Sequence, residues 1–228
     1  MPVESFSILP LDSAVLTAAS PWGIPVQVLS ETTSSNDDLL RMGEEKAPAG
    51  TLLFAERQTA GRGQFSRPWS SAPGLGLWFS LLLRLPIDDD TIPLLSAFAA
   101  VALVETIRVL GIAGCGIKSP NDVLINGQKV AGILVETRVG RDPFAVVGIG
   151  LNVNHSCEDF PEELRDRACS VAMANGHGNG KDKREPLDRN TLAVILLRNL
   201  GKQERLMSTD PGLLLSTWNE MLIRDTNP

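Results

Sequence analysis

The sequence is poor in the residues that build metal and disulfide sites. Its 228 residues include three cysteines, Cys115, Cys157 and Cys169, and two histidines, His155 and His177. No CxxC spacing and no HExxH motif occurs, which argues against zinc-ribbon and zinc-protease chemistry. We therefore expect unpaired thiols, with buried structural roles, in a reducing compartment. Both histidines fall in polar segments, and we expect them to be solvated at the surface.

Charge and hydropathy argue against further classes of protein. The formal net charge of −6 argues against broad binding to nucleic-acid phosphates, although it allows a local basic patch. No uninterrupted run of about 18 apolar residues occurs, so no membrane span is expected. The N-terminus carries Glu4 and no basic region, so no signal peptide is expected either. A cytoplasmic globular protein follows, whose 43% hydrophobic content can form a core without metal or disulfide staples.

Three common motifs for nucleotide binding and hydrolysis are also missing. The sequence contains no GxxxxGK[ST] P-loop and no GxSxG nucleophile elbow. The stretch Gly61-x-Gly63-x-x-Ser66 lacks the third glycine of a Rossmann fingerprint. Pro68 and Trp69 follow it, where that fingerprint requires the start of a helix. A dehydrogenase and an α/β-hydrolase are therefore not expected.

The predicted elements alternate irregularly. Strands are expected in 26–31, 51–57, 74–86, 117–137 and 144–154, and helices in 32–45, 93–111, 188–200 and 213–222. Asn126-Gly127 between apolar strands is typical of a hairpin turn. We expect a loose lead-in over 1–24, one catalytic domain over 25–225 and a surface loop over 175–186. Hairpins with few helices favour an α+β fold with a mixed, largely antiparallel sheet and packed helices.

Four cations stand beside glycine-rich segments. Arg62 and Arg67 share the loop 56–71, Lys118 precedes the letters SPND, and Lys129 follows the hairpin turn. Each alone is usually a solvated surface residue. Lys129, however, opens an apolar strand along which its stem can lie while its ammonium faces inward. We therefore expect the arginine loop and this lysine to meet two anionic groups, one a carboxylate and the other a polyphosphate.

Glycines within strands and one carboxylate leave alternatives open. Gly148 and Gly150 lie inside a predicted strand, where glycine often indicates close approach by a ligand or another backbone, or simply a bulge. Asp122, next to Asn121 at the start of the hairpin, is suited to bind Mg²⁺ directly or through water. It is equally suited to cap the turn.

Three motifs together resemble the catalytic module of biotin–protein ligases. GRGQFSRPW, KSPNDVLINGQKVAGILVE and GIGLNVN are similar to GRGRxGRxW, KWPNDV followed by KxxGIL, and GIGxN. TTSSND is similar to the Ser-Thr-Asn segment of that family, and the match covers about residues 25–220. The resemblance implies a core like that of class II aminoacyl-tRNA synthetases. It also implies ATP-dependent formation of biotinyl-5′-AMP, followed by transfer to a lysine of the biotin carboxyl carrier domain of acetyl-CoA carboxylase.

The resemblance also implies roles for individual residues. Arg62 and Lys129 are the expected catalytic residues. The expected biotin contacts are Ser34, Ser35, Gln58, Arg62 and Lys129. The expected ATP contacts are Arg62, Gln64, Trp69, Lys118, Asn121, Asp122 and Asn152, with Asp122 as the candidate Mg²⁺ ligand. ATP, Mg²⁺ and biotin are thus the small molecules implied.

The sequence departs from the family pattern in several places. Gln64, Phe65 and Ser66 replace arginine, arginine and glycine in the loop, and Ser119 replaces a tryptophan. We expect the family's C-terminal SH3-like domain to be absent, and no N-terminal helix-turn-helix, so no nucleic-acid partner. A homodimer is plausible by resemblance. Two alternatives stay open: a lipoate or octanoate ligase or transferase, and a relative that binds biotin or its adenylate without transfer. The spacing from SPND to KVAGIL favours biotin.

Overall fold

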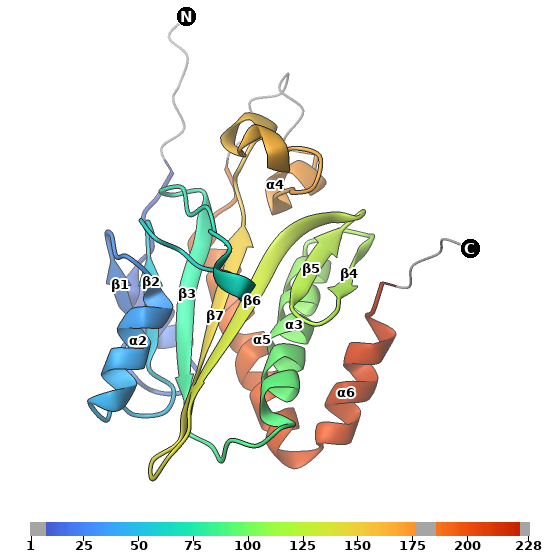
Figure 1. Cartoon of the computed structure of the whole chain (residues 1–228). Coiled ribbons are helices and arrows are strands. Elements are labelled where there is room, and N and C mark those ends of the chain that lie inside the picture. Colours follow the sequence, from blue (N-terminus) through green and yellow to red (C-terminus); the bar gives the residue numbers. More distant parts are fainter. Residues whose placement is uncertain (1–7, 177–185, 224–228) are drawn as a thin grey trace, which may run out of the picture.

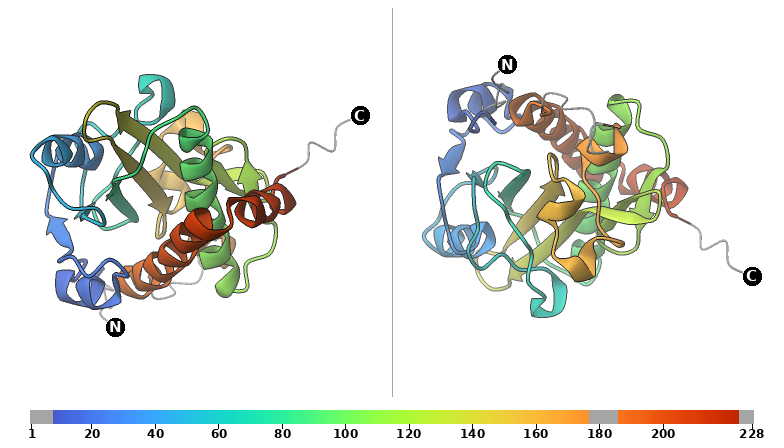
Figure 2. Two further views of the ribbon diagram at one scale, coloured as in Figure 1. Left: turned by 90° about the horizontal axis from the view of Figure 1, so that it is seen from below. Right: turned by 90° about the horizontal axis from the view of Figure 1, so that it is seen from above.

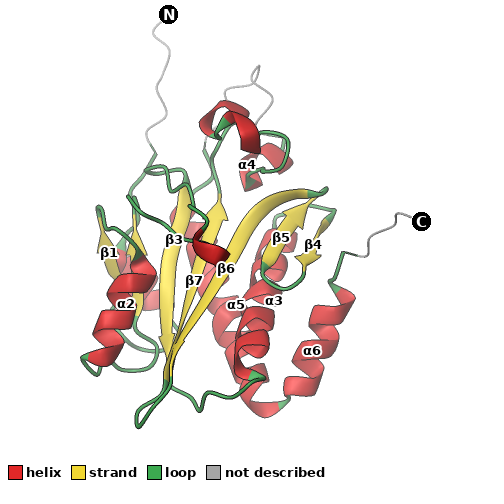
Figure 3. Cartoon of the chain, viewed as in Figure 1, coloured by secondary structure: helices red, strands yellow, loops and turns green. Residues whose placement is uncertain are grey.

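A seven-stranded sheet forms the centre of the protein. The structure is a computed structural model that describes residues 8–176 and 186–223. The strand order is β1-β2-β3-β7-β6-β5-β4, and every neighbouring pair is antiparallel except β1 with β2. The strands are β1 Gln27–Leu29, β2 Leu52–Ala55, β3 Gly76–Leu83, β4 Cys115–Lys118, β5 Asp122–Ile125, β6 Gln128–Arg138 and β7 Phe144–Asn152. The α+β prediction with a largely antiparallel sheet is confirmed (Figures 1 and 3).

The helices cover the two sheet faces unequally. They are α1 Ser13–Ala19, α2 Ser35–Glu44, α3 Thr91–Val109, α4 Val171–Ala174, α5 Arg189–Thr209 and α6 Pro211–Glu220. α3 and α5 lie against one face, while α2 lies on the opposite face beside β3 and β7 (Figure 2). The rest of that second face carries the loop 61–69 (Figure 1).

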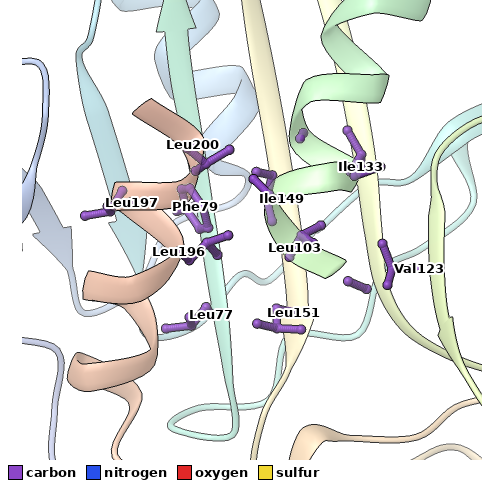
Figure 4. Packing of buried hydrophobic residues seen from close by; sticks show 14 of the residues in the cluster. Leu77, Phe79, Leu103, Val123, Ile133, Ile149, Leu151, Leu196, Leu197 and Leu200 are labelled. Carbon is purple, nitrogen blue, oxygen red and sulfur yellow. The ribbon is translucent and has the colours of Figure 1, made fainter. Parts of the chain in front are cut away.

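The alternation of β3 explains how the two faces differ. Leu77 and Phe79 point into the main core, where α5 residues such as Leu196 and Leu200 pack against them (Figure 4). Leu82, on the opposite face, joins a smaller cluster with α2. Side chains in a strand alternate between faces, so one apolar run can supply both clusters. β3 is therefore buried on both sides, although Ser80 interrupts its apolar run.

The hairpin predicted at Asn126-Gly127 is present. Both residues have positive φ, 50° and 84°, as the tight turns that suit two twisted antiparallel strands require. The segment 117–137 forms three strands, β4, β5 and β6, instead of the expected two. The turn holds Lys129 at the start of β6, one residue after the turn-closing Gln128.

The loose lead-in expected over 1–24 is wrong for the residues that the structure describes, 8–24. Asp12 caps α1 by accepting from the backbone of its first turn, and Leu16 is fully buried. Arg189, whose side chain is 1% exposed, forms an ion pair with Glu56 at 2.8 Å and donates to the carbonyl of Leu9. A buried guanidinium needs such acceptors, so this segment is fastened to the core.

The expectation of solvated histidines is wrong for His155, and His177 lies outside the described residues. The His155 side chain is buried, with its ring stacked 4.8 Å from the Phe160 ring and edge-on to Trp78. Burial lowers the pKa of His155 to about 4, against the opposing charge of Asp159. The polar sequence around His155 hid this, because Trp78 reaches it from β3 and Phe160 is the single aromatic residue in the polar segment that follows.

The prediction of unpaired thiols is confirmed, and that of burial is confirmed for Cys115 and Cys169. All three cysteines are unpaired; Cys115 and Cys169 are buried and Cys157 is half-buried. Burial raises the pKa of the Cys115 thiol to about 12 and that of Cys169 to about 11, so both stay protonated at neutral pH. Inert structural thiols are the expected result.

Hydropathy alone would mark α3 as a membrane span. An 18-residue window of this helix has a mean hydropathy of 1.8, although polar residues interrupt its apolar run. In the structure 67% of that window is buried inside the protein. α3 packs against the sheet and against α5 and α6, so its apolar surface is used as core.

Candidate functional site

A pocket lies on the α2 face of the sheet, beneath the loop that carries Arg62. Its volume is about 460 Å³, counting the space that is open to solvent. The floor of the pocket is formed by β6 and β7. Its walls are formed by the start of α2, by Gln58 in the segment after β2, and by the loop 61–69. The lining residues are Ser34, Ser35, Asn36, Gln58, Arg62, Gly63, Gln64, Trp69, Phe79, Asn121, Lys129, Gly132, Ile133, Leu134, Gly148, Ile149 and Gly150. Arg62 and Lys129 thus share one cavity.

Three glycines on the floor of the pocket, Gly132, Gly148 and Gly150, leave space that other side chains of the protein occupy. Gly132 and Gly150 are paired across β6 and β7, and the indole of Trp69 lies on both. A Cβ on Gly150 would lie 2.5 Å from Cε2 of Trp69, and one on Gly148 would lie 2.2 Å from Oδ1 of Asn36. The predicted close approach is therefore real, but the groups that fill the space are an indole and an amide.

Lys129 faces the pocket with a carboxylate beside it. Its ammonium lies 2.6 Å from Oδ1 of Asp122, in a close ion contact without the alignment of a hydrogen bond. The same ammonium lies 5.2 Å from the centre of the Trp69 ring, at cation–π distance. The backbone of Lys129 is fixed by exchange of hydrogen bonds with Arg167 and Cys169. The ammonium is therefore held in place at the pocket before any ligand arrives.

Arg62 reaches the pocket from the loop and is held by two carboxylates. Its guanidinium donates to Glu136 on β6, at 3.1–3.3 Å, and to Asp37 on α2. Burial lowers the pKa of Arg62, but the hydrogen bond to Asp37 and the charge of Glu136 outweigh it, so the pKa is raised. The loop is therefore tied across the pocket, from α2 to β6, by one side chain.

The other end of the pocket is polar and buried. The backbone N–H of Ser35 donates to Oε1 of Gln58 at 2.8 Å, and the Ser35 hydroxyl lies 2.7 Å from that of Ser80. Gln58 in turn donates to Ser71 at 3.1 Å. Ser34 is the N-cap residue of α2 by position, and its side chain makes no cap hydrogen bond. These groups can recognise a ligand with both hydrogen-bond donors and acceptors.

Eight of the predicted site residues line this pocket: Ser34, Ser35, Gln58, Arg62, Gln64, Trp69, Asn121 and Lys129. Three do not. Asp122 is in ion contact with Lys129, Lys118 is exposed at the end of β4, and buried Asn152 donates to the carbonyl of Cys169 at 3.1 Å. The predicted nucleotide contacts of these three residues stay predictions.

The sequence reasoning missed four polar residues of the site. Asn36, Ser80, Asp37 and Glu136 join the predicted residues through hydrogen bonds or ion pairs. Asn36 and Asp37 stand in the quoted segment TTSSND, and Glu136 ends KVAGILVE. Their position within matching motifs was a usable signal. Ser80 had none, because it lies inside an apolar strand.

The loop itself carries an apolar tip. Phe65 is 87% exposed and has a positive φ of 55°, which is uncommon for a residue with a side chain. Arg67 lies near this ring, with Cζ 6.0 Å from the ring centre, and does not line the pocket. The loop is closed at its base, where the backbone N–H of Trp69 donates to the carbonyl of Gly61 at 2.8 Å. Arg62 is thus the cation of the predicted loop that reaches the cavity.

Comparison with known proteins follows this geometry. The chain is 44% identical over 151 residues to the bifunctional ligase/repressor BirA of Bacillus spizizenii, which spans 65% of this chain and 46% of that protein. It is 34% identical over 195 residues to the biotin–[acetyl-CoA-carboxylase] ligase of Mycobacterium tuberculosis, covering 83% and 67%. The chain therefore spans about half the length of the Bacillus relative.

Solved structures agree with the fold. The biotin protein ligase of Aquifex aeolicus, in complex with biotin and ATP, superposes with a TM-score of 0.70 at 27% identity, over 87% of this chain and 78% of that one. Residues 27–154, more than half of the chain, match the biotin/lipoate A/B protein ligase family. That range contains every residue that lines the pocket. The chain belongs to the biotin/lipoate A/B protein ligase family.

Proposed function

We propose that this protein joins biotin to a lysine of a biotin carboxyl carrier domain, using ATP. The observation that carries the proposal is the shared pocket of Arg62 and Lys129, with the polar group around Ser35 and Gln58 at its other end. Two relatives named biotin–[acetyl-CoA-carboxylase] ligase support it. The acceptor named there makes the carrier domain of acetyl-CoA carboxylase the expected partner.

The two cations address the first chemical step. An oxygen of the biotin carboxylate attacks the α-phosphorus of ATP, and pyrophosphate leaves. Both reactants are anionic, so they repel each other unless positive charge lies where they meet. Lys129, already oriented by Asp122, is suited to hold the carboxylate beside the α-phosphate. Arg62 on the loop is suited to the phosphate side of the same junction.

The second step transfers the acyl group. A carrier lysine attacks the acyl carbon of biotinyl-5′-AMP, AMP leaves and the new amide nitrogen loses a proton. The mixed anhydride hydrolyses in open water, so a cover that excludes water protects it. The loop 61–69, which already spans the pocket through Arg62, is suited to that role.

The polar end of the pocket favours biotin over lipoate or octanoate. The ureido ring of biotin carries two N–H donors and a carbonyl, whereas a dithiolane or an alkyl chain carries no such groups. The buried Ser35 hydroxyl, which accepts no hydrogen bond from the described residues, would lose water against an apolar ligand and gain no partner. A site built for hydrogen bonds rejects such an analogue strongly.

The residues present do not form a protein-held Mg²⁺ site. Among the described residues no group of three metal-ligating side chains occurs, and Asp122 is already paired with Lys129. Hard cations such as Mg²⁺ commonly bind through substrate phosphates with one or two carboxylates. We therefore assign any Mg²⁺ requirement to the ATP substrate, and we give Asp122 the role of orienting Lys129.

Location and assembly follow from the proposed reaction. The three unpaired cysteines agree with the reducing cytoplasm, where ATP and acetyl-CoA carboxylase are available in bacteria. A homodimer stays a prediction that depends on the family resemblance. Light scattering with and without biotin measures it directly.

Two assays test the function. Purified protein with ATP, Mg²⁺ and biotin should exchange labelled pyrophosphate into ATP in a biotin-dependent way, and should then label a carrier-domain lysine. Lipoate and octanoate in place of biotin should give no exchange. Exchange without carrier labelling would assign only adenylate synthesis to this chain. Biotin binding without exchange would favour the non-catalytic relative, and exchange with lipoate alone would contradict the proposal.

A further inference from the structure

A continuous set of hydrogen bonds joins the two ends of the pocket. Glu136 accepts from Arg62 at 3.1 Å and from Nδ2 of Asn36 at 2.8 Å. Oδ1 of Asn36 accepts from the Ser80 hydroxyl at 2.6 Å, and Ser80 lies 2.7 Å from the hydroxyl of Ser35. Glu136 is therefore the residue through which the arginine loop and the biotin end are connected.

The Ser35 hydroxyl accepts no hydrogen bond in this network. Ser80 has a single hydroxyl hydrogen, which it gives to Asn36, so the Ser35 hydroxyl donates toward Ser80 at 2.7 Å or toward Oε1 of Gln58 at 3.1 Å. Oε1 of Gln58 also accepts from the backbone N–H of Ser35. The lone pairs of the Ser35 hydroxyl remain free to accept a hydrogen bond within the pocket. The carboxylate of Glu136 sets this order, because it can only accept from Asn36.

The connecting groups are buried and rigidly mounted. Ser80 is fully buried on β3, Asn36 is 4% exposed in the first turn of α2, and Gly148 leaves the space that the Asn36 amide occupies. Buried polar groups with every partner present fix one geometry, because breaking any bond leaves an unpaired group in low dielectric. A change at Glu136 will therefore be felt at both ends.

We propose that Glu136 is a positioning residue for the adenylation step. It fixes the guanidinium of Arg62 over the pocket and, through Asn36 and Ser80, keeps the Ser35 hydroxyl oriented as an acceptor. The hydrogen bonds of Arg62 to described side chains use Nη1 and Nη2, so its Nε–H can still donate to a ligand. This inference rests on the proposed biotin–ATP reaction.

Asp37, the second carboxylate at Arg62, is the natural comparison. Its side chain is 50% exposed, against 23% for Glu136, so solvent screens its attraction for the arginine more strongly. Asp37 makes no hydrogen bond to Asn36 among the described residues. The two carboxylates therefore place similar charge near Arg62, but among the described residues only Glu136 is connected to Ser35, through the hydrogen bonds of Asn36 and Ser80.

The experiment compares Glu136→Gln, Glu136→Asp and Asp37→Asn with wild type. A glutamine is neutral and has one carbonyl oxygen. That oxygen can accept from both Asn36 and Arg62, as Oε2 of Glu136 does, but an amide N–H₂ then replaces the Oε1 that accepts twice from Arg62. Glu44→Gln is the matched control, because Glu44 pairs with Arg138 at 3.0 Å on the surface and away from the pocket. Each variant is measured for biotin affinity by calorimetry, for kcat of pyrophosphate exchange and for thermal unfolding.

We expect Glu136→Gln to lose about 10- to 100-fold in kcat and about tenfold in biotin affinity. Asp37→Asn should lose less than about threefold in each, Glu136→Asp should recover part of the loss, and Glu44→Gln should match wild type. In an Arg62→Lys background, Glu136→Gln should still weaken biotin binding but should hardly change kcat further. That split separates positioning from a general loss of stability.

Three results would overturn the proposal. A rise in exchange rate for Glu136→Gln would mean that the carboxylate restrains Arg62. Equal losses for Glu136→Gln and Asp37→Asn would reduce the effect to charge alone. Wild-type kinetics in Glu136→Gln would remove any positioning role. If wild type itself gave no exchange, the proposed reaction would fail while the biotin-affinity comparison would still test the Ser35 end.

Discussion

The ammonium of Lys129 lies 2.6 Å from the carboxylate of Asp122 on the neighbouring strand. β5 and β6 are joined by the Asn126-Gly127 turn, and a register shift follows Val123 in this hairpin. Lys129 lines the pocket, whereas Asp122 does not. We infer that Asp122 restricts where the lysine can point; the metal-ligand role expected from sequence stays a prediction.

Replacing Asp122 by asparagine tests that role. The neutral amide attracts the ammonium less, so Lys129 becomes less fixed and the biotin carboxylate less well placed. We expect about a tenfold loss in kcat/KM for biotin, corresponding to roughly 1.4 kcal/mol, with the Mg²⁺ concentration dependence unchanged. Pyrophosphate exchange at varied Mg²⁺ measures both quantities. A shifted Mg²⁺ dependence would instead return Asp122 to the metal.

The glutamine at position 64 should weaken retention of the intermediate. Gln64 lines the pocket where the family usually has arginine, so one charge near the adenylate phosphate is missing. We expect biotinyl-5′-AMP to escape faster from wild type than from Gln64→Arg, by about tenfold for one charge-assisted hydrogen bond. Release of preformed adenylate in a chase experiment measures this. Equal rates for the two proteins would show that the position does not hold the phosphate.

A methyl group on the floor should displace the indole. The Cβ of Gly150→Ala would lie 2.5 Å from Trp69, which is too close for any packed atom. We expect a loss of nucleotide affinity of about 1–3 kcal/mol from the displaced ring. Biotin affinity should change less, because the head-end residues are untouched. Gly212→Ala in α6, whose nearest neighbour atom would lie 3.5 Å away, is the control and should leave both affinities unchanged.

The buried imidazole of His155 predicts a loss of stability in mild acid. Its pKa is about 4 in the folded protein and about 6.5 in the unfolded chain. Above pH 6.5 the imidazole is neutral in both the folded and the unfolded state, so its burial does not lower the free energy of unfolding. As the pH falls from 6.5 to 4 the unfolded state takes up the proton first, so stability falls by up to about 3 kcal/mol. Urea unfolding across this range measures the slope.

His155→Phe is the matching variant for that measurement. Phenylalanine can keep the stack on Phe160 and cannot take up a proton. Its stability should depend less on pH between 6.5 and 4 than that of wild type, whatever its absolute stability. An identical slope in the two proteins would mean that His155 is not the group responsible.

Local sequence predicted the elements where one physical rule dominated. The Asn126-Gly127 turn, the long apolar α3 and the helical stripe of α5 depend on short-range conformational preference and on periodicity. Arg62 and Lys129 were predicted together because each stands in a motif with known spacing. The structure confirms that they share a cavity.

Contacts between distant segments could not be predicted in this way. Arg62 and Glu136 are 74 positions apart, and Asn36 and Glu136 are 100 apart. No local pattern relates such residues until the sheet places β6 beside α2. The same reason applies to His155, whose polar neighbours in sequence gave no sign of Trp78 above it.

The sequence by itself determined the class of fold, the hairpin that carries Lys129 and the identity of the residues able to meet an anion. The tertiary structure alone decided which carboxylates these cations face and which polar groups are buried. Backbone preference acts over a few neighbouring residues, whereas burial and ion pairing depend on how the whole chain packs.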